Sequence, residues 1–120
     1  MKVKNYTELV AWKKAMELVQ AIYDETKDFP SPELYGLRLQ IRKAGISVPS
    51  NIAEGQGRMS TAEFRHHLSI AHGSLREIET QVLISEKLGY LDNQAASGLV
   101  NRTSEVRKLI NGLLNSLPSR

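Results

Sequence analysis

The sequence contains no cysteine among its 120 residues. This absence excludes a disulfide framework, a thiolate metal site and a thiol nucleophile. Aromatic residues are also few, with one Trp, two Phe and four Tyr, which leaves little surface on which single-stranded bases could stack. No apolar run reaches the length of a signal peptide or a membrane span. We therefore expect a cytoplasmic protein without membrane contact.

Charges of both signs are present, with only a small excess of one. Lys and Arg number 16 against 13 Asp and Glu, so the formal net charge is +3 and the pI is about 9.3. A mildly basic chain is a weak indication of binding to nucleic acid or other polyanions. The length and the 41% content of hydrophobic residues predict one globular domain over residues 1–120.

Strand-like alternation is absent, and four segments instead repeat apolar residues every three or four positions, as amphipathic helices do. They cover residues 7–27, 32–54, 61–88 and 92–117. Short connections favour antiparallel packing of successive helices. The sequence therefore predicts an all-α fold, an antiparallel up-down-up-down four-helix bundle.

Each segment has its own start signal and its own inward stripe. Thr7, Ser31, Ser60 and Asp92 are good helix N-caps. For the first segment, the expected core stripe is Leu9, Trp12, Met16, Val19 and Tyr23. For the second it is Leu34, Leu37, Ile41, Ala44, Val48 and Ile52. For the third and fourth, it is Phe64, Leu68, Ala71, Leu75, Ile78 and Val82, and then Leu99, Val106, Ile110, Leu113 and Leu117.

Pro49 lies inside the second segment, where proline removes a helical hydrogen bond and clashes with the preceding turn. Because the apolar stripe continues in phase beyond Pro49, we predict a second helix that is kinked there and not split.

The second segment carries more apolar surface than a single bundle needs. Tyr35, Leu39, Ile46 and Ala53 lie on a side of the helix about 150° from its core stripe. The third segment also has apolar residues outside its core stripe, although fewer of them. They are Ile70, Ile84 and Leu88. A helix that is apolar on two sides is either central or covered by another subunit, so we predict self-association. The alternative is that these residues are scattered surface hydrophobes, which are common.

No set of residues predicts catalysis, a metal site or a cofactor. Glu63 and His66 have the Glu-x-x-His spacing of di-iron bundles, but no second such pair occurs. Glu63 already fits a capping box, and histidine on a solvated helix face is the simpler interpretation of His66. We predict no enzymatic activity.

Basic residues are the better candidates for a binding function. Six of them lie on or between the second and third segments, where they could contact the phosphates of nucleic acid. They are Arg38, Arg42, Lys43, Arg58, Arg65 and Arg76. The alternative is ordinary solvated charge, paired in part with nearby carboxylates.

Several stretches resemble a known family. They are Trp12, the run Tyr35-Gly36-Leu37, residues 46–55 (ISVPSNIAEG), residues 70–79 (IAHGSLREIE) and residues 88–91 (LGYL). In these stretches the chain resembles the four-helix bundle proteins encoded in intervening sequences of 23S ribosomal RNA genes. That family is similar in fold to the accessory variability determinant of diversity-generating retroelements, a basic pentameric barrel that binds a reverse transcriptase and nucleic acid.

The resemblance implies a four-helix subunit, a homopentamer and binding to RNA or DNA, and it offers no catalytic residues. Two hypotheses follow. In the first, the protein is a non-enzymatic homo-oligomer that binds nucleic acid through its basic surface. In the second, it is an adaptor that recruits a protein partner, and its charge serves solubility alone.

Overall fold

The computed structural model describes residues 5–6 and 9–118 of the chain. Four helices make up the fold, namely α1 (Val10–Thr26), α2 (Leu37–Gln56), α3 (Thr61–Lys87) and α4 (Asn93–Ser116). A short 3₁₀ helix, η2 (Ser31–Glu33), precedes α2. The described residues contain no strand, so the predicted all-α four-helix fold is confirmed. The predicted cap at Thr7 lies outside the described residues.

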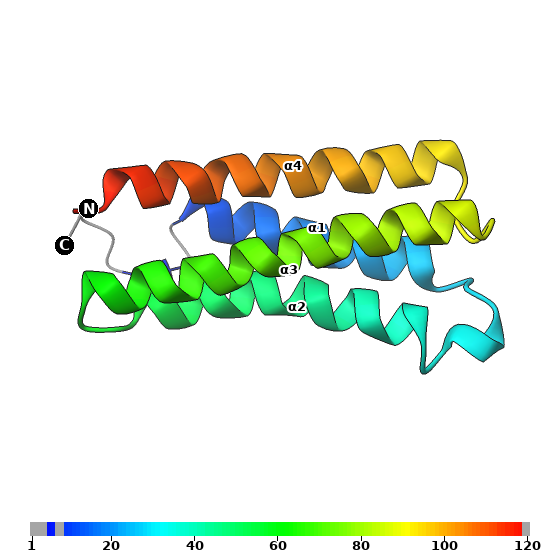
Figure 1. Cartoon of the computed structure of the whole chain (residues 1–120), viewed down its shortest axis with the longest axis horizontal. Coiled ribbons are helices and arrows are strands. Elements are labelled where there is room, and N and C mark those ends of the chain that lie inside the picture. Colours follow the sequence, from blue (N-terminus) through cyan, green and yellow to red (C-terminus); the bar gives the residue numbers. More distant parts are fainter. Residues whose placement is uncertain (1–4, 7–8, 119–120) are drawn as a thin grey trace.

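The helices form an elongated square bundle with principal extents of 45 × 24 × 21 Å. Along the chain, each helix runs back in the direction opposite to the one before it (Figure 1). Within the described part of the chain, α1 packs on α2 and α4, and α3 packs on α2 and α4, whereas neither diagonal pair is in contact. Every helix therefore has two neighbours and an outer side that no helix of the same chain covers.

Helix boundaries follow from local side-chain chemistry. The Ser60 hydroxyl accepts a hydrogen bond from the Glu63 N–H at 3.1 Å, and the Asp92 carboxylate accepts one from the Ala95 N–H at 2.8 Å. Both caps satisfy backbone donors that a helix start leaves free. Gly89 follows α3 with a φ of 82°, a left-handed conformation that glycine adopts without strain.

The predicted start of the second helix at Pro32 is wrong. The first residues of that segment form η2, and Gly36 then breaks the helical path with a φ of −111° and a ψ of −113°. The carboxylate of Glu33 accepts the Leu37 N–H at 2.9 Å and so caps α2 from the preceding turn. From Leu37 the helix runs without interruption through Pro49 to Gln56. A bend at Pro49 stays a prediction.

Nine of the largest fully buried side chains are Leu18, Ile22, Ile41, Ile52, Leu68, Leu75, Ile78, Leu99 and Ile110. All six residues of the predicted α3 stripe are buried, as are Leu99, Val106 and Ile110 of α4. In α2, four of the six predicted residues are buried, while Leu37 is half-buried and Leu34 is exposed. The described helices include none that is long and apolar enough to cross a membrane.

The predicted core stripe of the first segment is right at Leu9, which is buried, but wrong at Met16 and Tyr23. Met16 is 46% exposed and Tyr23 is 38% exposed, whereas the buried face carries Ala11, Ala15 and Leu18, followed one turn later by Ile22. The prediction followed the larger apolar side chains, but two alanines face the core because their small side chains let α1 approach the neighbouring helices closely. The larger apolar side chains of α1 consequently lie on a second side of the helix.

Candidate assembly surface and basic residues

An apolar surface lies on the outside of the bundle where α1 meets α2. We call it the α1–α2 face. It contains a hollow of about 340 Å³ that is lined mainly by apolar side chains. The lining residues are Tyr6, Trp12, Met16, Val19, Ile46, Pro49, Ser50 and Ala53. Positions 12, 16 and 19 share one side of α1, and positions 39, 46 and 53 recur every seven residues along α2, so the face follows from helical spacing.

The structure brings two of the four predicted interface residues together in this hollow. Ile46 and Ala53 both line the hollow. Leu39 lies further toward the start of α2, with 40% of its surface exposed, and Tyr35 lies just before α2 with 88% exposed. Leu39, Ile46 and Ala53 thus share one side of α2, whereas Tyr35 precedes the break at Gly36.

The contribution of α1 to this face was missed by the sequence prediction. Trp12, Met16 and Val19 had been assigned to the core. The sequence does contain a pattern that indicates this contribution. A second apolar stripe of the same helix consists of Ala11, Ala15, Leu18 and Ile22. A helix with two apolar stripes cannot bury both within one square bundle, in which two neighbours cover only part of its circumference.

Arg38 and Arg42 lie between α1 and α2, where they bind the end of α1. The Nε of Arg42 donates to the Thr26 hydroxyl at 3.0 Å, and one Nη donates to the Tyr23 carbonyl at 3.3 Å. The same guanidinium lies 4.2 Å from the centre of the Tyr23 ring, and Arg38 donates to the Lys27 carbonyl at 3.4 Å. Cations here satisfy carbonyls that the helix end leaves free and oppose its negative partial charge.

Arg65 binds the end of another helix. It donates to the Leu117 carbonyl at 3.0 Å and to the Pro118 carbonyl at 2.9 Å. Arg58 forms an exposed ion pair with Glu54 at 2.6 Å. Within the part of the chain that the structure describes, Lys43 and Arg76 are exposed and their side chains form no hydrogen bond or ion pair.

The six basic residues do not converge on one site. Arg38, Arg42 and Lys43 lie in the first half of α2, whereas Arg58 follows its end. The distance between Arg38 and Arg58 along the helix axis is about 30 Å at 1.5 Å per residue. Any phosphate contacts would therefore be spread along the bundle.

A row of hydrogen-bonded polar side chains joins α2 to α3. One ring nitrogen of His67 lies 2.9 Å from the Asn51 side-chain oxygen, and the Asn51 amide donates to the Ser47 carbonyl at 2.9 Å. The Ser74 hydroxyl donates to the Ser47 hydroxyl at 2.8 Å. At Gly55, an added Cβ would come within 2.7 Å of the His67 Cβ, so glycine allows this close approach of the two helices. These residues fix the packing of α2 on α3.

The Glu63 and His66 pair projects into solvent. Both residues are exposed, and residues 5–6 and 9–118 include no group of three or more His, Asp or Glu side chains placed to hold a metal ion. His67 is engaged in the α2–α3 row described above.

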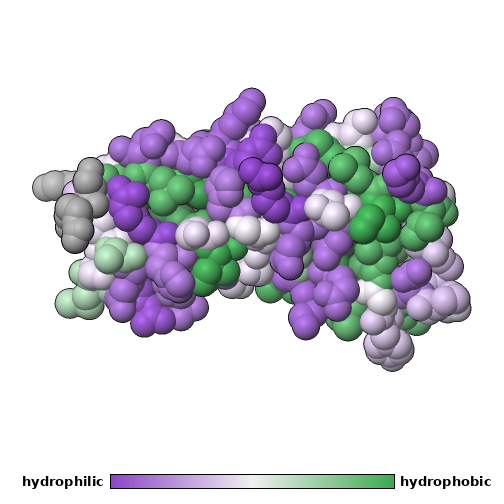
Figure 2. Space-filling model, viewed as in Figure 1, coloured by the Kyte–Doolittle hydropathy of each residue, from purple (hydrophilic) through white to green (hydrophobic). Residues whose placement is uncertain are grey.

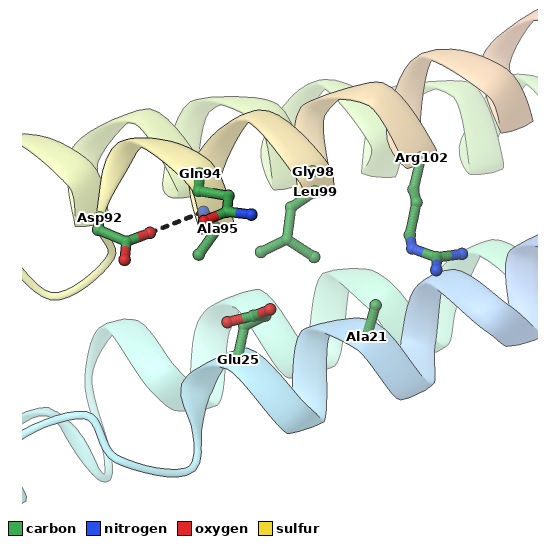
Figure 3. A pocket seen from close by; sticks show the side chains of 8 residues that line it. All are labelled: Ala21, Glu25, Asp92, Gln94, Ala95, Gly98, Leu99 and Arg102. Atoms are coloured by element: carbon green, nitrogen blue, oxygen red, sulfur yellow. Dashed lines mark hydrogen bonds between the residues drawn. The ribbon is translucent and has the colours of Figure 1, made fainter.

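A second hollow, of about 460 Å³, lies between α1 and α4. Its floor consists of small residues and Leu99, while Glu25 and Asp92 lie toward one end and Arg102 toward the other (Figure 3). Asp92 is the N-cap of α4, and Arg102 lies 3.7 Å from Glu17. Two of the three charged groups thus already have a partner within the subunit.

Tyr90 ties the loop between α3 and α4 to the start of α2. Its hydroxyl donates to the second carboxylate oxygen of Glu33 at 3.1 Å, and its ring packs on Phe29 with centroids 5.4 Å apart. This hydrogen bond raises the pKa of Tyr90 above its ordinary value, and desolvation and the charge of Glu33 act in the same direction. These contacts hold the loop that follows α3 against the segment between α1 and α2.

Comparisons with known proteins agree with the fold. The family model described as 23S rRNA-intervening sequence protein matches residues 7–112. A crystal structure of a protein of unknown function from the S23 ribosomal protein family of Bacteroides thetaiotaomicron is similar in fold, with a TM-score of 0.83 at 23% identity. The similarity covers 89% of this chain and 100% of that one. No curated protein matches the chain. Neither of the two descriptions names a reaction.

Proposed function

The chain belongs to the 23S rRNA-intervening sequence protein family, and we propose that it is a non-enzymatic, cytoplasmic homo-oligomer that binds nucleic acid through its basic surface. The proposed assembly is a pentamer, as the resemblance to the accessory variability determinant implies. In this proposal the protein has a scaffolding role and needs no cofactor.

The single observation that carries the proposal is the α1–α2 face. Met16, Leu39 and Ile46 are each 40% or more exposed and lie on one side of the bundle. Monomeric proteins rarely leave a contiguous apolar surface of this kind uncovered. Each Å² of apolar area that a partner removes from water favours association by about 25 cal/mol. A second copy of the chain is the proposed partner, because it is present wherever the protein is made.

Nucleic-acid binding follows from the basic residues, of which Lys43, Arg58 and Arg76 have the most accessible charges. Lys43 and Arg76 are exposed without a described ion-pair partner, and the ion pair of Arg58 is exposed. A net charge of +3 is small for one subunit, but assembly adds the charges of all copies in one particle. Phosphate contacts multiplied in this way strengthen binding to a long polyanion by avidity.

The alternative function is a protein-interaction adaptor without nucleic-acid binding. The contacts of Arg38, Arg42 and Arg65 with helix ends favour it, because these charges have a structural role in the isolated subunit. A protein partner that stays bound after nuclease treatment would support this alternative.

Light scattering of the purified protein, alone and with structured RNA or duplex DNA, tests the proposal. We expect a mass several times the 13.4 kDa of one chain, and a further increase with nucleic acid at low salt that is lost at high salt. A measured mass equal to that of one chain at every protein concentration would contradict the proposed self-association. An assembled protein that binds neither RNA nor DNA at low salt would contradict nucleic-acid binding. The protein-interaction adaptor would then be the remaining proposal.

A further inference from the structure

We infer that a small polar hollow between α2 and α3 binds a free α-amino acid in its zwitterionic form. The carboxylate of this ligand contacts α2 and its ammonium group contacts α3. The inference goes beyond the proposed self-association and nucleic-acid binding, and it depends on neither of them.

The hollow has a volume of about 220 Å³ and lies beside the row of hydrogen-bonded side chains that joins α2 to α3. Its lining residues are Gln40, Lys43, Ala44, Ser47, Ser74, Glu77 and Gln81. All of these except Ala44 are polar or charged. In the view of Figure 2, hydrophilic surface over α3 lies between separate hydrophobic areas. We call this site the α2–α3 hollow, and its size and lining suit one compact polar molecule.

The α2 wall of the hollow presents hydrogen-bond donors. Lys43 and Ser47 are one helical turn apart, so their side chains are neighbours. The Ser47 hydroxyl accepts from Ser74 at 2.8 Å and from Asn51 at 3.1 Å, and its own hydrogen has no acceptor in residues 5–6 and 9–118. The Lys43 ammonium is exposed and, over the same residues, forms no hydrogen bond or ion pair. Both donors are available to a carboxylate.

The α3 wall presents acceptors. Glu77 and Gln81 are also one turn apart on their helix. The Gln81 side-chain oxygen is buried and has no hydrogen-bond partner among the residues that the structure describes. The Glu77 carboxylate is exposed and likewise has no described partner. A buried acceptor without a donor costs stability, because it has lost its hydrogen bonds to water. The Gln81 oxygen therefore points to a donor from outside the subunit.

The two walls match along the bundle, because α2 and α3 are neighbours that run in opposite directions (Figure 1). At 1.5 Å per residue, and counted from the Ser74–Ser47 hydrogen bond, Lys43 is displaced by about 6 Å and Glu77 by about 4.5 Å in the same direction. The two charges thus lie at similar heights on opposite walls, and in the described structure no ion pair joins them.

A zwitterion is the kind of ligand that uses both walls at once. A carboxylate alone leaves the acceptors of α3 unpaired, and an ammonium alone leaves the donors of α2 unpaired, which lowers affinity. An α-amino acid carries both groups on one carbon and is small. Because Ala44 is the one apolar lining residue, we expect glycine, serine and glutamine to bind more tightly than leucine or phenylalanine.

Isothermal titration calorimetry of the purified wild-type chain, without nucleic acid, tests the inference. We expect saturable binding of glycine, serine or glutamine with one molecule per chain. Acetate and methylamine each carry only one of the two charges, and they should bind at least about tenfold more weakly. If none of the three amino acids shows saturable binding up to about 10 mM, the inference is overturned.

Charge-removing variants locate the site. Lys43→Gln and Glu77→Gln each remove one of the two charges of the hollow, and each should weaken amino-acid binding at least about tenfold. Lys87→Gln and Glu79→Gln make the same changes on α3 at positions that do not line the hollow, and they should bind as the wild type does. Equal weakening by the control variants would show that binding depends on net charge and would overturn the assignment of the site.

Gln81→Leu separates a binding role from a structural one. It removes the unpaired buried oxygen, so the midpoint of urea denaturation should stay unchanged or rise, while amino-acid affinity falls. A lower midpoint with unchanged affinity would show that Gln81 serves the fold alone and would overturn its assignment as a ligand contact.

The outcomes also distinguish this inference from the proposed function. Absence of amino-acid binding leaves the expected particle mass and the salt-dependent binding of nucleic acid untouched. A monomeric protein that binds neither RNA nor DNA, but binds glycine or serine, contradicts the proposed function and supports the α2–α3 hollow.

Discussion

Helix α1 meets solvent on two sides that differ in kind. Beside α4, its outer side carries charge. Lys14 lies 3.5 Å from Glu17 and 3.6 Å from Glu105, and Arg102 lies 3.7 Å from Glu17. Beside α2, the same helix exposes Met16 and lines a hollow with Trp12 and Val19. Exposed ion pairs contribute little to stability but keep a surface soluble. The contrast teaches that α1 has one charged and one apolar outer side, and that only the apolar side is a candidate surface for the proposed self-association.

The largest expected effect tests which side of α1 is the core. Leu18→Ala removes a fully buried side chain and should lower the free energy of unfolding by about 2–5 kcal/mol. Met16→Ala, two residues away, should lower it by no more than about 1 kcal/mol in the monomer. Urea denaturation at low protein concentration measures both. Equal losses of unfolding free energy in the two variants would contradict the assignment of Leu18 to the core and of Met16 to the surface.

The second prediction concerns association. Met16→Glu places a charge in the apolar hollow and should weaken self-association at least about tenfold, which corresponds to about 1.4 kcal/mol. Val10→Glu makes the same change of charge at a 55% exposed position on another side of the same helix and should leave association unchanged. Sedimentation velocity over a concentration series measures both variants. An equal effect of the two variants would show that net charge, and not the apolar face, controls assembly.

A third prediction compares two cations that are neighbours in the sequence of α2, of which Arg42 contacts α1 and Lys43 lines a hollow between α2 and α3. Arg42→Gln removes charged hydrogen bonds to α1 and should cost about 1–2 kcal/mol of stability. Lys43→Gln should change stability by less than about 0.5 kcal/mol. In the nucleic-acid proposal, Lys43→Gln should instead reduce the slope of duplex-DNA affinity against salt by about 0.9, the value for one phosphate contact. An unchanged slope would remove Lys43 from the binding surface.

Tyr90 offers a control away from both sides of α1. Tyr90→Phe keeps the ring beside Phe29 but removes the bond to Glu33, so it should lower the free energy of unfolding. Because the pKa of Tyr90 is raised in the folded protein, this contribution is complete below the ordinary tyrosine pKa of about 10 and is lost as pH rises through the raised pKa. Denaturation of both proteins between pH 8 and about pH 11 should show the difference shrinking at the alkaline end.

The smallest expected effect is on the charged side of α1. Glu17→Gln removes the exposed pairs with Lys14 and Arg102 and should change the free energy of unfolding by less than about 0.5 kcal/mol. Association should not change either. Thermal denaturation at low and high salt is the measurement, and a loss comparable with that of Leu18→Ala would show that this side is also structurally essential.

Prediction from sequence succeeded where one pattern dominated a segment. The seam of α3 from Phe64 to Val82 was identified in full because its apolar residues follow steps of three and four with few competitors. Prediction failed in α1, where two apolar stripes compete and the larger residues of one outweighed the alanines of the other. It also placed the start of α2 too early, because the capping carboxylate of Glu33 acts from outside the helix.

The candidate functional residues were also predicted correctly only where local spacing determines their position. Spacing alone identified Ile46 and Ala53 as an apolar side of α2, and the structure adds Trp12 and Met16 from α1. The basic residues were grouped by type, but their partners are distant in sequence. Arg65 binds carbonyls that follow it by more than 50 residues. Such a partner is set by the packing of α3 on α4, which no local pattern encodes.

By itself, the sequence determined that the chain forms four amphipathic helices and that these helices carry more apolar surface than they can bury together. Both properties depend on local spacing, because side chains three or four positions apart share a side of a helix. Tertiary structure alone decided which of two apolar stripes on α1 faces the core and which cations cap a helix end. Those outcomes depend on how closely two backbones approach, and that distance is set by side chains from different parts of the chain.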